Sequence, residues 1–396
     1  MARAFLFVLD SVGIGGANDA LRFDDVGSNT LGHIIEKAES GEADRPGLRS
    51  GKLKCPNLAR LGFFHALKLA SNHESVAQYL PDTVDGFWGA SAEVSNGKDT
   101  PSGHWELAGL PVPWDWHYFP DETPAFPDHV SAHLAEMAGT DGILGNCHAS
   151  GTAVIADLGA EHCKTGWPIC YTSADSVLQI AAHEDHFGLE RLLDLCRAVA
   201  PLLHEMKVGR VIARPFVGDA TSGFERTANR RDFAIVPPKP VLTNWVQDAG
   251  GKVYGIGKIG DIFSMQGIDE VRKGRDAALM EHLSDLIDEA EDGSFTFANF
   301  VEFDSEYGHR RDVSGYARAL EWFDREIGQI IARLRPGDLM VLTADHGNDP
   351  TWIGTDHTRE RVPVLVTGGA QGPLGQIGFA DVAQLVAGHL GVAAQT

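Results

Sequence analysis

Three aspartates, Asp10, Asp304 and Asp345, each come directly after a short apolar run that has the composition of a buried strand. If the three runs are parallel strands of one sheet, the carboxylates lie at the same carboxyl edge, where ligands bind in this architecture. A single aspartate in such a position is most often a helix N-cap or a solvated turn residue. Three of them together, with histidines close behind Asp304 and Asp345, favour a shared chemical site.

The histidines that accompany these aspartates are His309, His346 and His357. Because the chain contains 17 histidines, any single one is more often a surface or hydrogen-bonded core residue than a ligand. Mixed carboxylate and imidazole ligands suit manganese, zinc or iron better than calcium or magnesium. Six such groups are enough for two ions about 4 Å apart, the spacing of two-metal phosphoryl-transfer sites.

A candidate nucleophile lies between Asn96 and Glu106, where the hydroxyl of Thr100 is followed by small residues. Such a residue can open a helix, and the free N–H groups and positive end of the first helical turn favour a phosphoryl group. A plain N-cap threonine is an equally good interpretation of this stretch taken alone. Neutral threonine is a weak nucleophile, and coordination to a metal ion would activate it without a separate general base.

The overall composition excludes several classes of function. A formal net charge of -22 repels DNA, RNA and anionic membranes, and it would also repel a phosphorylated substrate unless local positive charge overcame it. No apolar run is long enough to span a bilayer, the amino terminus does not resemble a signal peptide, and the five cysteines form no CxxC pair. These features predict a cytoplasmic protein with no membrane or nucleic-acid partner.

The candidate ligands and nucleophile need secondary-structure elements that bring them together, and short apolar runs are candidate strands. The runs are Ala4–Leu9, Val253–Ile256, Ala298–Phe303, Leu339–Leu342 and Val362–Val366. Two stretches between them have helical spacing: residues 314–334, with Ser314 as the N-cap, and residues 276–290. The alternation of strand and helix over residues 236–396 predicts a doubly wound α/β sheet.

The middle of the chain has a different character, with Gly/Pro-interrupted stretches and few strand–helix alternations. The proline-rich segment Pro237–Pro240 is typical of a rigid hinge. We therefore expect a mostly parallel α/β core from residues 1–105 and 236–396, with residues 106–235 inserted as an α+β cap domain. A chain of 396 residues exceeds what one compact core usually holds, which agrees with two domains.

Beyond these patterns, segments spread over nearly the whole chain match a known family. They are Phe7–Gly15, Gly27–His33, Gly97–Glu106, Tyr171–Glu184, Gly209–Phe216, Phe303–Asp312, Thr343–Trp352 and Gly354–Glu360. In these segments the chain resembles the phosphopentomutase family of the alkaline-phosphatase superfamily. The metal-type motifs alone indicate only the superfamily, whereas Tyr171–Glu184 in the middle domain is the segment that indicates the pentose enzyme. One departure is Asn18, where proline is expected, in a loop that is not catalytic.

The resemblance implies a core of alkaline-phosphatase type and gives roles to the candidate residues. It implies that one ion is held by Asp10, Asp345 and His346 and the other by Asp304, His309 and His357. Thr100 would lie between the ions and carry the phosphoryl group. Superfamily relatives have a serine at this position, three residues before Gly-His, and that spacing selects Thr100 over Ser102.

The implied activity is the interconversion of ribose 1-phosphate and ribose 5-phosphate, and of the 2-deoxyribose analogues, through phosphorylated Thr100 and a sugar 1,5-bisphosphate. The implied cofactors are two Mn²⁺ ions, with glucose 1,6-bisphosphate or ribose 1,5-bisphosphate as the primer. Ser173 and Asp175 offer hydrogen bonds to sugar hydroxyls, while Arg210 and Lys258 could neutralise the distal phosphate. Internal salt bridges or turns are an almost equally good interpretation of Arg210 and Lys258.

Two alternatives have different signatures. A phosphatase or a cofactor-independent phosphoglycerate mutase would share the metal ligands but need a different cap, and Tyr171–Glu184 argues against it. A non-catalytic metal-binding or sugar-sensing protein would have lost a ligand or the nucleophile, and neither is lost in this chain. No obligate protein partner is evident, so small-molecule pentose phosphates are the expected partners.

Overall fold

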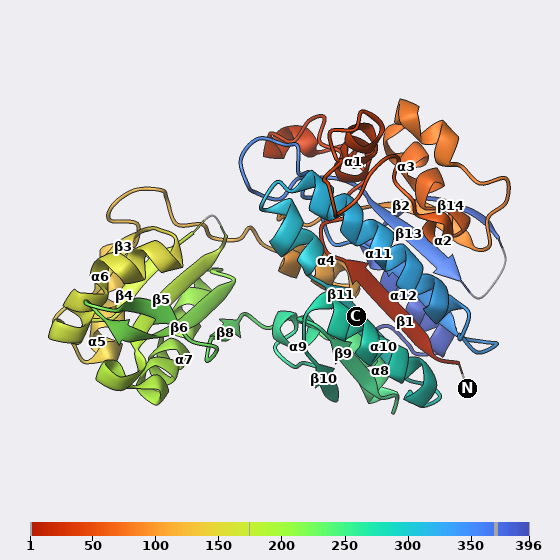
Figure 1. Cartoon of the computed structure of the whole chain (residues 1–396). Helices are drawn as coiled ribbons and strands as arrows, with labels where there is room; N and C mark the ends of the chain where they lie inside the picture. The colour runs from red at the N-terminus through yellow and green to blue at the C-terminus, as the bar shows by residue number, and fades with distance from the viewer. Residues whose placement is uncertain (1, 174, 368–370, 396) are drawn as a thin grey trace. The chain divides into compact units, whose positions relative to one another are not determined.

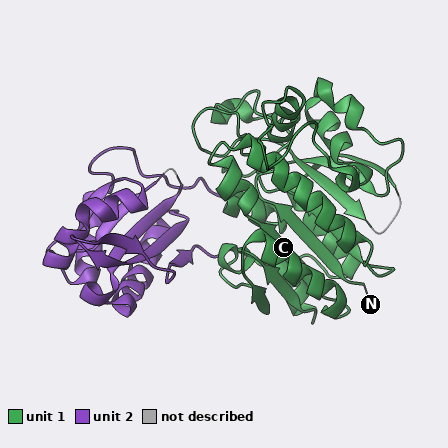
Figure 2. Ribbon diagram, in the orientation of Figure 1, with its two compact units in different colours: residues 1–113, 237–396 green, residues 114–236 purple. Residues whose placement is uncertain are grey.

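The computed structural model describes residues 2–173, 175–367 and 371–395. The chain divides into two compact units, unit 1 with residues 1–113 and 237–396 and unit 2 with residues 114–236 (Figure 2). Each unit is built around a β-sheet of its own. The role of unit 2 as a substrate-covering cap stays a prediction.

The first division lies eight residues beyond the predicted end of the core segment at residue 105. Residues 106–113 still belong to unit 1, because Val112 N donates to Ser95 Oγ at 3.0 Å and Leu242 N donates to Ala108 O at 2.9 Å. The second division falls at Pro237, where the proline-rich segment begins.

Unit 1 is built on an eight-stranded sheet (Figure 1). In spatial order its strands are β10 (Glu270–Arg272), β9 (Val253–Ile256), β11 (Phe295–Phe300), β1 (Ala4–Leu9), β12 (Leu339–Thr343), β13 (Val362–Thr367), β2 (Phe87–Ala92) and β14 (Gly372–Gly378). The strands from β10 to β12 run parallel, whereas β13 is antiparallel to both of its neighbours. Every residue of β1 is buried, as expected for a parallel strand covered on both faces. The predicted α/β class with a mostly parallel sheet is confirmed.

The strand predictions hold for β1 and β9, whose bounds match the apolar runs. The predicted strand Ala298–Phe303 is displaced by three residues, because β11 pairs with β1 and both strands end together at Phe300 and Leu9. The chain then turns into η4 (Phe303–Gly308), a π-helical segment. Asp304 consequently lies inside this segment rather than directly at a strand end.

The helices of unit 1 fall into two groups whose members contact one another. One group contains α1 (Thr30–Glu39), α2 (Pro56–Arg60), α3 (Phe63–Ser71), α10 (Asp276–Glu289) and α11 (Val313–Ile331), and the other contains α4 (Thr100–Leu107), α8 (Leu242–Asp248), α9 (Ile259–Ile262) and α12 (Phe379–Leu390). Asp312 caps α11 by accepting from Gly315 N at 3.0 Å, so the prediction of Ser314 as the N-cap is wrong. No helix within the described residues combines the length and apolar character that a membrane crossing requires.

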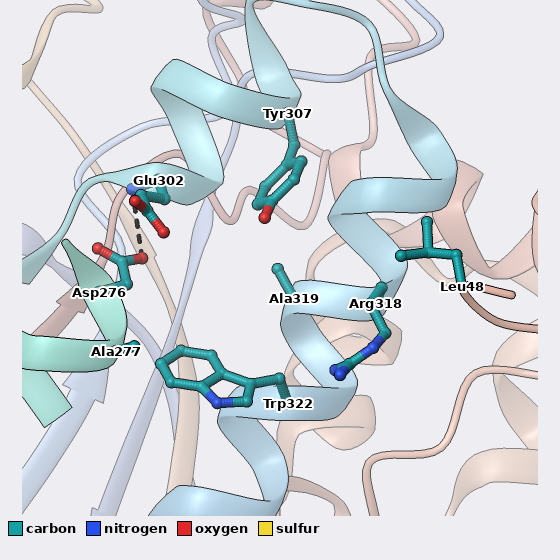
Figure 3. Close-up of a pocket in the computed structure, with 8 residues that line it drawn as sticks. All are labelled: Leu48, Asp276, Ala277, Glu302, Tyr307, Arg318, Ala319 and Trp322. Atoms are coloured by element: carbon teal, nitrogen blue, oxygen red, sulfur yellow. Dashed lines mark hydrogen bonds between the residues drawn. The ribbon is translucent and has the colours of Figure 1, made fainter.

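A pocket of about 280 Å³ opens between α10, η4 and α11 (Figure 3). Its lining includes Asp276, Glu302, Tyr307, Arg318 and Trp322. Asp276 Oδ2 accepts a hydrogen bond from Glu302 N at 3.2 Å, and burial raises the pKa of Asp276 to about 7. The lining residues are separate from those predicted for the catalytic site.

Unit 2 has a six-stranded mixed sheet with helices on both faces. Its elements are α5 (Asp128–Ala138), β3 (Leu144–His148), α6 (Gly151–Thr165), β4 (Ile169–Thr172), β5 (Val177–His183), η3 (Glu184–Gly188), α7 (Leu189–Glu205), β6 (Arg210–Asp219), β7 (Gly223–Arg226) and β8 (Arg231–Ala234). Along β5, Leu178 and Ile180 pack into a core with α5 and α7, while Ala181 packs into a second core with α6. This alternation is the two-residue period of a strand buried on both faces.

Candidate active site

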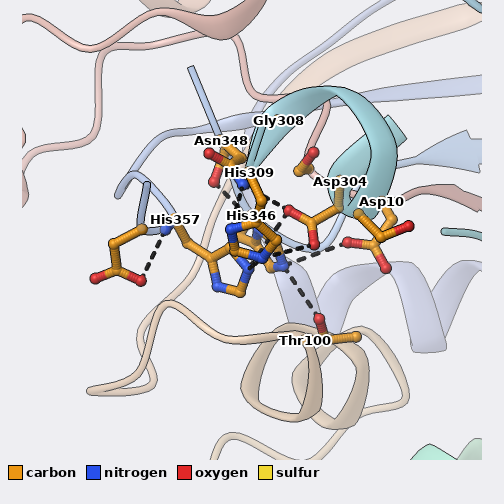
Figure 4. Close-up of polar contacts among 12 residues, drawn as sticks. Asp10, Thr100, Asp304, Gly308, His309, His346, Asn348 and His357 are labelled. Atoms are coloured by element: carbon orange, nitrogen blue, oxygen red, sulfur yellow. Dashed lines mark hydrogen bonds and ion pairs between the residues drawn. The ribbon is translucent and has the colours of Figure 1, made fainter. Parts of the chain in front are cut away.

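The candidate site lies at the carboxyl ends of neighbouring strands in unit 1 (Figure 4). Because β1 and β12 are parallel neighbours, Asp10 and the pair Asp345–His346 emerge at the same edge of the sheet. Asp304 lies in η4 and His309 directly after it, beyond the end of β11 on the other side of β1. His357 comes from the loop before β13. The sheet topology thus brings all six predicted ligands to one region.

Asp304, His309 and His357 form one tight group. Asp304 Oδ2 lies 3.1 Å from His309 Nε2, and Asp304 Oδ1 lies 3.4 Å from His357 Nε2. The two imidazoles face each other with 3.2 Å between their Nε2 atoms. The ligand atoms of all three residues lie within 4.8 Å of one another, as binding to a common metal ion requires.

A second group contains Asp10, Asp304 and His346, whose ligand atoms also lie within 4.8 Å of one another. His346 Nε2 is 3.4 Å from Asp10 Oδ1 and 3.3 Å from Asp345 Oδ2. The resemblance placed Asp345 with Asp10 and His346, and the geometry adds Asp304 to this neighbourhood. Asp304 therefore belongs to both groups.

Each of the three histidines turns its Nδ1 toward a main-chain carbonyl. The Nδ1 contacts are His309 with Thr355 O at 2.6 Å, His346 with Gly347 O at 3.1 Å and His357 with Lys98 O at 2.9 Å. A neutral histidine that donates from Nδ1 has a lone pair on Nε2, and all three Nε2 atoms face carboxylates. This is a tautomer in which imidazole can bind a metal ion through Nε2.

The carboxylates have buried acceptor atoms without a full set of donors. Asp10 Oδ1 accepts no hydrogen bond from the residues that the structure describes, and Asp345 Oδ2 has no well-aligned one, although His104 Nδ1 lies 3.1 Å from it. Buried acceptors and negative charge gathered in this way are costly unless a cation is present. The donor set therefore fits metal ions, and its mixture of carboxylate and imidazole suits manganese, zinc or iron.

Burial and neighbouring charges shift the pKa values of the cluster in different directions. Burial, with the charges of Asp345 and Asp304, raises the pKa of Asp10 well above its usual range. Burial also lowers the pKa of His346 to about 4, so this imidazole is neutral near neutral pH. Burial opposes the ionisation of Asp304, but the adjacent histidines, His357 foremost, outweigh it and hold that pKa well below its usual range. Neutral His346 is the form that can offer its Nε2 lone pair.

Thr100 is the first residue of α4, and its Oγ1 lies 3.3 Å from His346 Nε2. The N-cap is Asp99, whose Oδ1 accepts a hydrogen bond from Ser102 N at 3.0 Å. Thr100 is therefore not an N-cap threonine, and its hydroxyl faces the cluster (Figure 4). Ser102 turns the other way, with its Oγ donating to Asp99 Oδ2 at 3.2 Å.

Each of the three carboxylates has one oxygen fixed by a hydrogen-bond donor that the sequence analysis did not single out. The pairs are Asn299 Nδ2 with Asp10 Oδ2 at 2.9 Å, Asn348 Nδ2 with Asp304 Oδ1 at 2.7 Å and Ser11 N with Asp345 Oδ1 at 3.1 Å. An asparagine inside an apolar strand run is a signal that could have revealed Asn299, because a buried amide needs partners.

The predicted substrate-binding residues belong to different units. Ser173, Asp175 and Arg210 are in unit 2, whereas Lys258 is in unit 1. Arg210 Nη2 lies 3.1 Å from Asp175 Oδ2, so these residues form the internal salt bridge that the sequence analysis kept as an alternative. The charge of Lys258 lowers the pKa of Asp10, but the opposing effect of burial is larger.

Comparison with known proteins defines the class to which this fold and site belong. The model of the metalloenzyme superfamily matches residues 2–394, so the chain is a member of that superfamily. The solved structure of a protein from Pyrococcus horikoshii has a similar fold, with a TM-score of 0.50 at 14% identity, and the alignment covers 100% of this chain and 98% of that one.

Curated relatives identify the family within this class. The phosphopentomutase of Rhizobium leguminosarum bv. trifolii is 55% identical over 402 residues, which covers 100% of this chain and 98% of the relative. The phosphopentomutase of Chelativorans sp. is 56% identical over 398 residues, which covers 100% and 97% respectively. The chain belongs to the phosphopentomutase family. It is accordingly an enzyme, an isomerase of the phosphotransferase type.

Proposed function

We propose that this enzyme interconverts ribose 1-phosphate and ribose 5-phosphate, together with the 2-deoxyribose analogues, by way of phosphorylated Thr100. The observation that supports this most strongly is the position of the Thr100 hydroxyl, which opens α4 and lies 3.3 Å from His346 Nε2 beside the carboxylates. The names of the relatives, at 55% and 56% identity, support the same substrate class.

The proposed metal is manganese, with two ions per chain. One ion would be held by Asp10, Asp345 and His346, and the other by Asp304, His309 and His357. Bound Mn²⁺ would supply positive charge for the phosphoryl oxygens and lower the pKa of a coordinated hydroxyl. The chain's own contribution is a neutral His346 and carboxylates that each have one oxygen already fixed.

In the proposed reaction, phosphorylated Thr100 donates its phosphoryl group to the free hydroxyl of a bound pentose phosphate. The P–O bond to Thr100 Oγ1 breaks as a P–O bond to the sugar forms, and the proton of the sugar hydroxyl ends on Thr100 Oγ1. The sugar 1,5-bisphosphate then returns its other phosphoryl group to Thr100. The N–H groups in the first turn of α4 would stabilise the charge of the group in transit. Glucose 1,6-bisphosphate or ribose 1,5-bisphosphate would phosphorylate Thr100 at the outset.

Unit 2 is the proposed cap, which would keep water from phosphorylated Thr100 and supply contacts to the pentose. Ser173 and Asp175 would hydrogen-bond to sugar hydroxyls, and Arg210 and Lys258 would neutralise the distal phosphate. Because Arg210 pairs with Asp175 at 3.1 Å, phosphate binding would compete with this salt bridge. The proposed setting is the cytoplasm, with pentose phosphates as the partners.

A coupled assay of ribose 1-phosphate conversion, with Mn²⁺ and glucose 1,6-bisphosphate, tests this proposal. Thr100→Ala should lower kcat about 10³-fold or more, because the acceptor of the phosphoryl group is gone. Mn²⁺ binding measured by calorimetry should persist, because the proposed ligands are other side chains. Thr100→Ser should keep part of the activity, since it restores a hydroxyl at the same place. The matched control is Ser102→Ala, which removes a hydroxyl from the same helical turn.

Mass spectrometry after incubation with the primer gives a second readout. A single phosphoryl group should be found on Thr100 and none on Ser102. Label on Ser102, or full activity in Thr100→Ala, would contradict the assignment of the nucleophile. Release of inorganic phosphate as fast as pentose isomerisation would identify a phosphatase instead.

A further inference from the structure

Two fully buried polar residues, His104 and Asn299, lie beneath the candidate ligands without belonging to either group. His104 comes from α4 and Asn299 from β11. Between them they contact Thr100, Asp10 and Asp345, which are the proposed nucleophile and two of the proposed ligands. The pair therefore connects four segments of the chain at one buried point: α4, β11, the end of β1 and the loop after β12.

The side-chain amide of Asn299 sets the tautomer of His104. Asn299 Nδ2 lies 2.9 Å from Asp10 Oδ2 and 3.2 Å from His104 Nε2, so each of its two hydrogens has one partner. With Asp10 ionised, as a metal ligand must be, the opposite orientation of the amide would place its carbonyl oxygen against the Asp10 carboxylate, which is repulsive. Because His104 Nε2 accepts from this amide, the proton of the neutral imidazole is on Nδ1.

His104 Nδ1 in turn donates to the main-chain oxygen of Thr100 at 2.9 Å and lies 3.1 Å from Asp345 Oδ2. The ring stacks on Phe297, with 5.8 Å between the ring centroids. Phe297 and Asn299 are two residues apart on β11 and therefore share a face of that strand. One strand thus supplies both the surface that orients the ring and the donor that sets its tautomer.

We propose that His104 and Asn299 are positioning residues that fix the main chain of Thr100 relative to Asp10 and Asp345. This inference rests on the proposed function and extends it to residues that touch neither substrate nor metal. His104 donates a hydrogen bond to the main-chain oxygen of Thr100. Asn299 fixes the tautomer of His104 and donates to one oxygen of Asp10. A displacement of about 1 Å at a reacting group can cost about 10²-fold in rate, so small shifts in this pair have large effects.

The chain contains a comparison residue outside the site. His162 in unit 2 is also fully buried, donates from Nδ1 to Trp167 O at 2.6 Å and accepts at Nε2 from His183 N at 2.9 Å. Substitutions of His162 therefore report the general cost of disturbing a buried imidazole that uses both nitrogens. They leave Thr100 and the proposed ligands untouched.

The decisive experiment compares His104→Asn with His104→Gln in the full chain. Asparagine places its amide nitrogen near the position of Nδ1 and can keep the bond to Thr100 O, but it has no atom near Nε2. Glutamine reaches the position of Nε2 and can keep the bond from Asn299, but it leaves Thr100 O without this donor. His162→Asn and His162→Gln are the matched controls.

We expect His104→Asn to keep kcat within about tenfold of wild type and His104→Gln to lower it about 10²-fold or more, with KM for ribose 1-phosphate changed less than about threefold. Equal losses in both His104 variants, in proportion to lost thermal stability as in the His162 pair, would overturn the proposal. An unchanged kcat in His104→Gln would overturn it as well. His104 would then be a packing residue.

Two further measurements do not depend on mutase activity. Amide hydrogen exchange in α4 should be faster in His104→Gln than in His104→Asn when both are measured at the same interval below Tm. Calorimetry should show Mn²⁺ affinity weakened about tenfold or more in Asn299→Ala, which releases Asp10 Oδ2, and little changed in His104→Asn. If wild type isomerises no pentose phosphate but these differences are present, the proposed function fails and the positioning role stands. If wild type is active and the differences are absent, the positioning role alone fails.

Discussion

Asp304 is the side chain on which both groups of candidate ligands depend. One of its oxygens faces His357 and the other faces His309, and Asn348 donates to the first. Asp304 is proposed as a ligand of the ion with His309 and His357, but its carboxylate also lies among the candidate ligands of the other ion. We therefore expect its loss to weaken the binding of both proposed ions, whereas loss of His309 or His357 should act on one.

Asp276, in the pocket beside η4, makes a pH-dependent contribution to stability. Burial raises its pKa from the ordinary value of 3.8 to about 7, and the nearby charge of Glu302 adds to the effect. The folded state therefore keeps a proton that the unfolded chain releases near pH 4. Stability is consequently lost as the pH rises from about 4 to about 7, by about 4 kcal/mol at most.

Asp276→Asn should remove this pH dependence, because an amide oxygen can still accept from Glu302 N without ionising. Denaturant unfolding at about pH 5 and about pH 8 measures it, and wild type should lose about 2.5 kcal/mol more than the variant between these conditions. Asp285→Asn, at an exposed position of the same helix, is the control. Equal pH slopes in wild type and Asp276→Asn would refute the argument.

Among single residues, those with a chemical partner nearby in the sequence could be predicted. Asp345 and His346 are adjacent, and Asp304 and His309 are five residues apart, so their clustering is visible in the chain itself. The bond between Asn299 and His104 joins positions 195 residues apart, and no local pattern identifies the partner of either. Such contacts depend on which strands become neighbours, and periodicity does not reveal that.

Helix α4 approaches the loop after β12, which carries Asp345, so closely that only glycine fits at the contact. A Cβ on Gly103 would lie 2.1 Å from the main-chain oxygen of Asp345, so any side chain there must move the helix or the loop. The same helix is fixed by Trp105, which donates from Nε1 to Ile262 O at 3.1 Å. The place of Thr100 therefore follows from the packing of the whole helix.

Gly103→Ala should displace α4, lower kcat about 10²-fold and cost about 1–3 kcal/mol in the free energy of unfolding. The matched control is Gly388→Ala in α12, where a Cβ has nothing within 4 Å. Alanine there should stabilise the protein by up to about 1 kcal/mol through helix propensity. Steady-state kinetics and thermal unfolding measure both variants, and a wild-type kcat in Gly103→Ala would contradict the packing argument.

At the scale of elements, the types of the predicted strands and helices in unit 1 could be predicted, but the end of the strand before Asp304 could not. The apolar run that contains β11 continues as far as Phe303, which is buried in η4. Hydrophobicity alone does not distinguish the last residues of a strand from a helical segment that is also buried. The strand ends at Phe300 because its partner β1 ends at Leu9, and that limit is known only once the pairing is known.

The charge of the whole molecule opposes the substrate that the site is proposed to bind. With a net charge of -22, repulsion of a pentose phosphate should be strongest at low ionic strength. Raising the salt concentration from about 0.01 M to about 0.15 M shortens the screening length from about 30 Å to about 8 Å. We therefore expect kcat/KM for ribose 1-phosphate to rise about two- to fivefold over this range, with kcat unchanged.

Potassium chloride and tetramethylammonium chloride should act alike, which separates screening from binding of a particular cation. A steady fall of kcat/KM with salt would instead show that positive charge within the site outweighs the net charge of the molecule. The sign of the salt effect therefore shows whether the net charge of the molecule or the positive charge within the site dominates substrate association.

The central place of β1 in its sheet has a consequence for the way the protein is made. β1 emerges from the ribosome before its partners β11 and β12, which begin only at Phe295 and Leu339. At about 5–20 residues per second, this wholly apolar segment waits about 15–60 s for a neighbour. Unit 2, complete by residue 236, can fold in the meantime. During translation the unpaired edges of β1 are therefore open to aggregation, and synthesis of β11 and β12 ends that exposure.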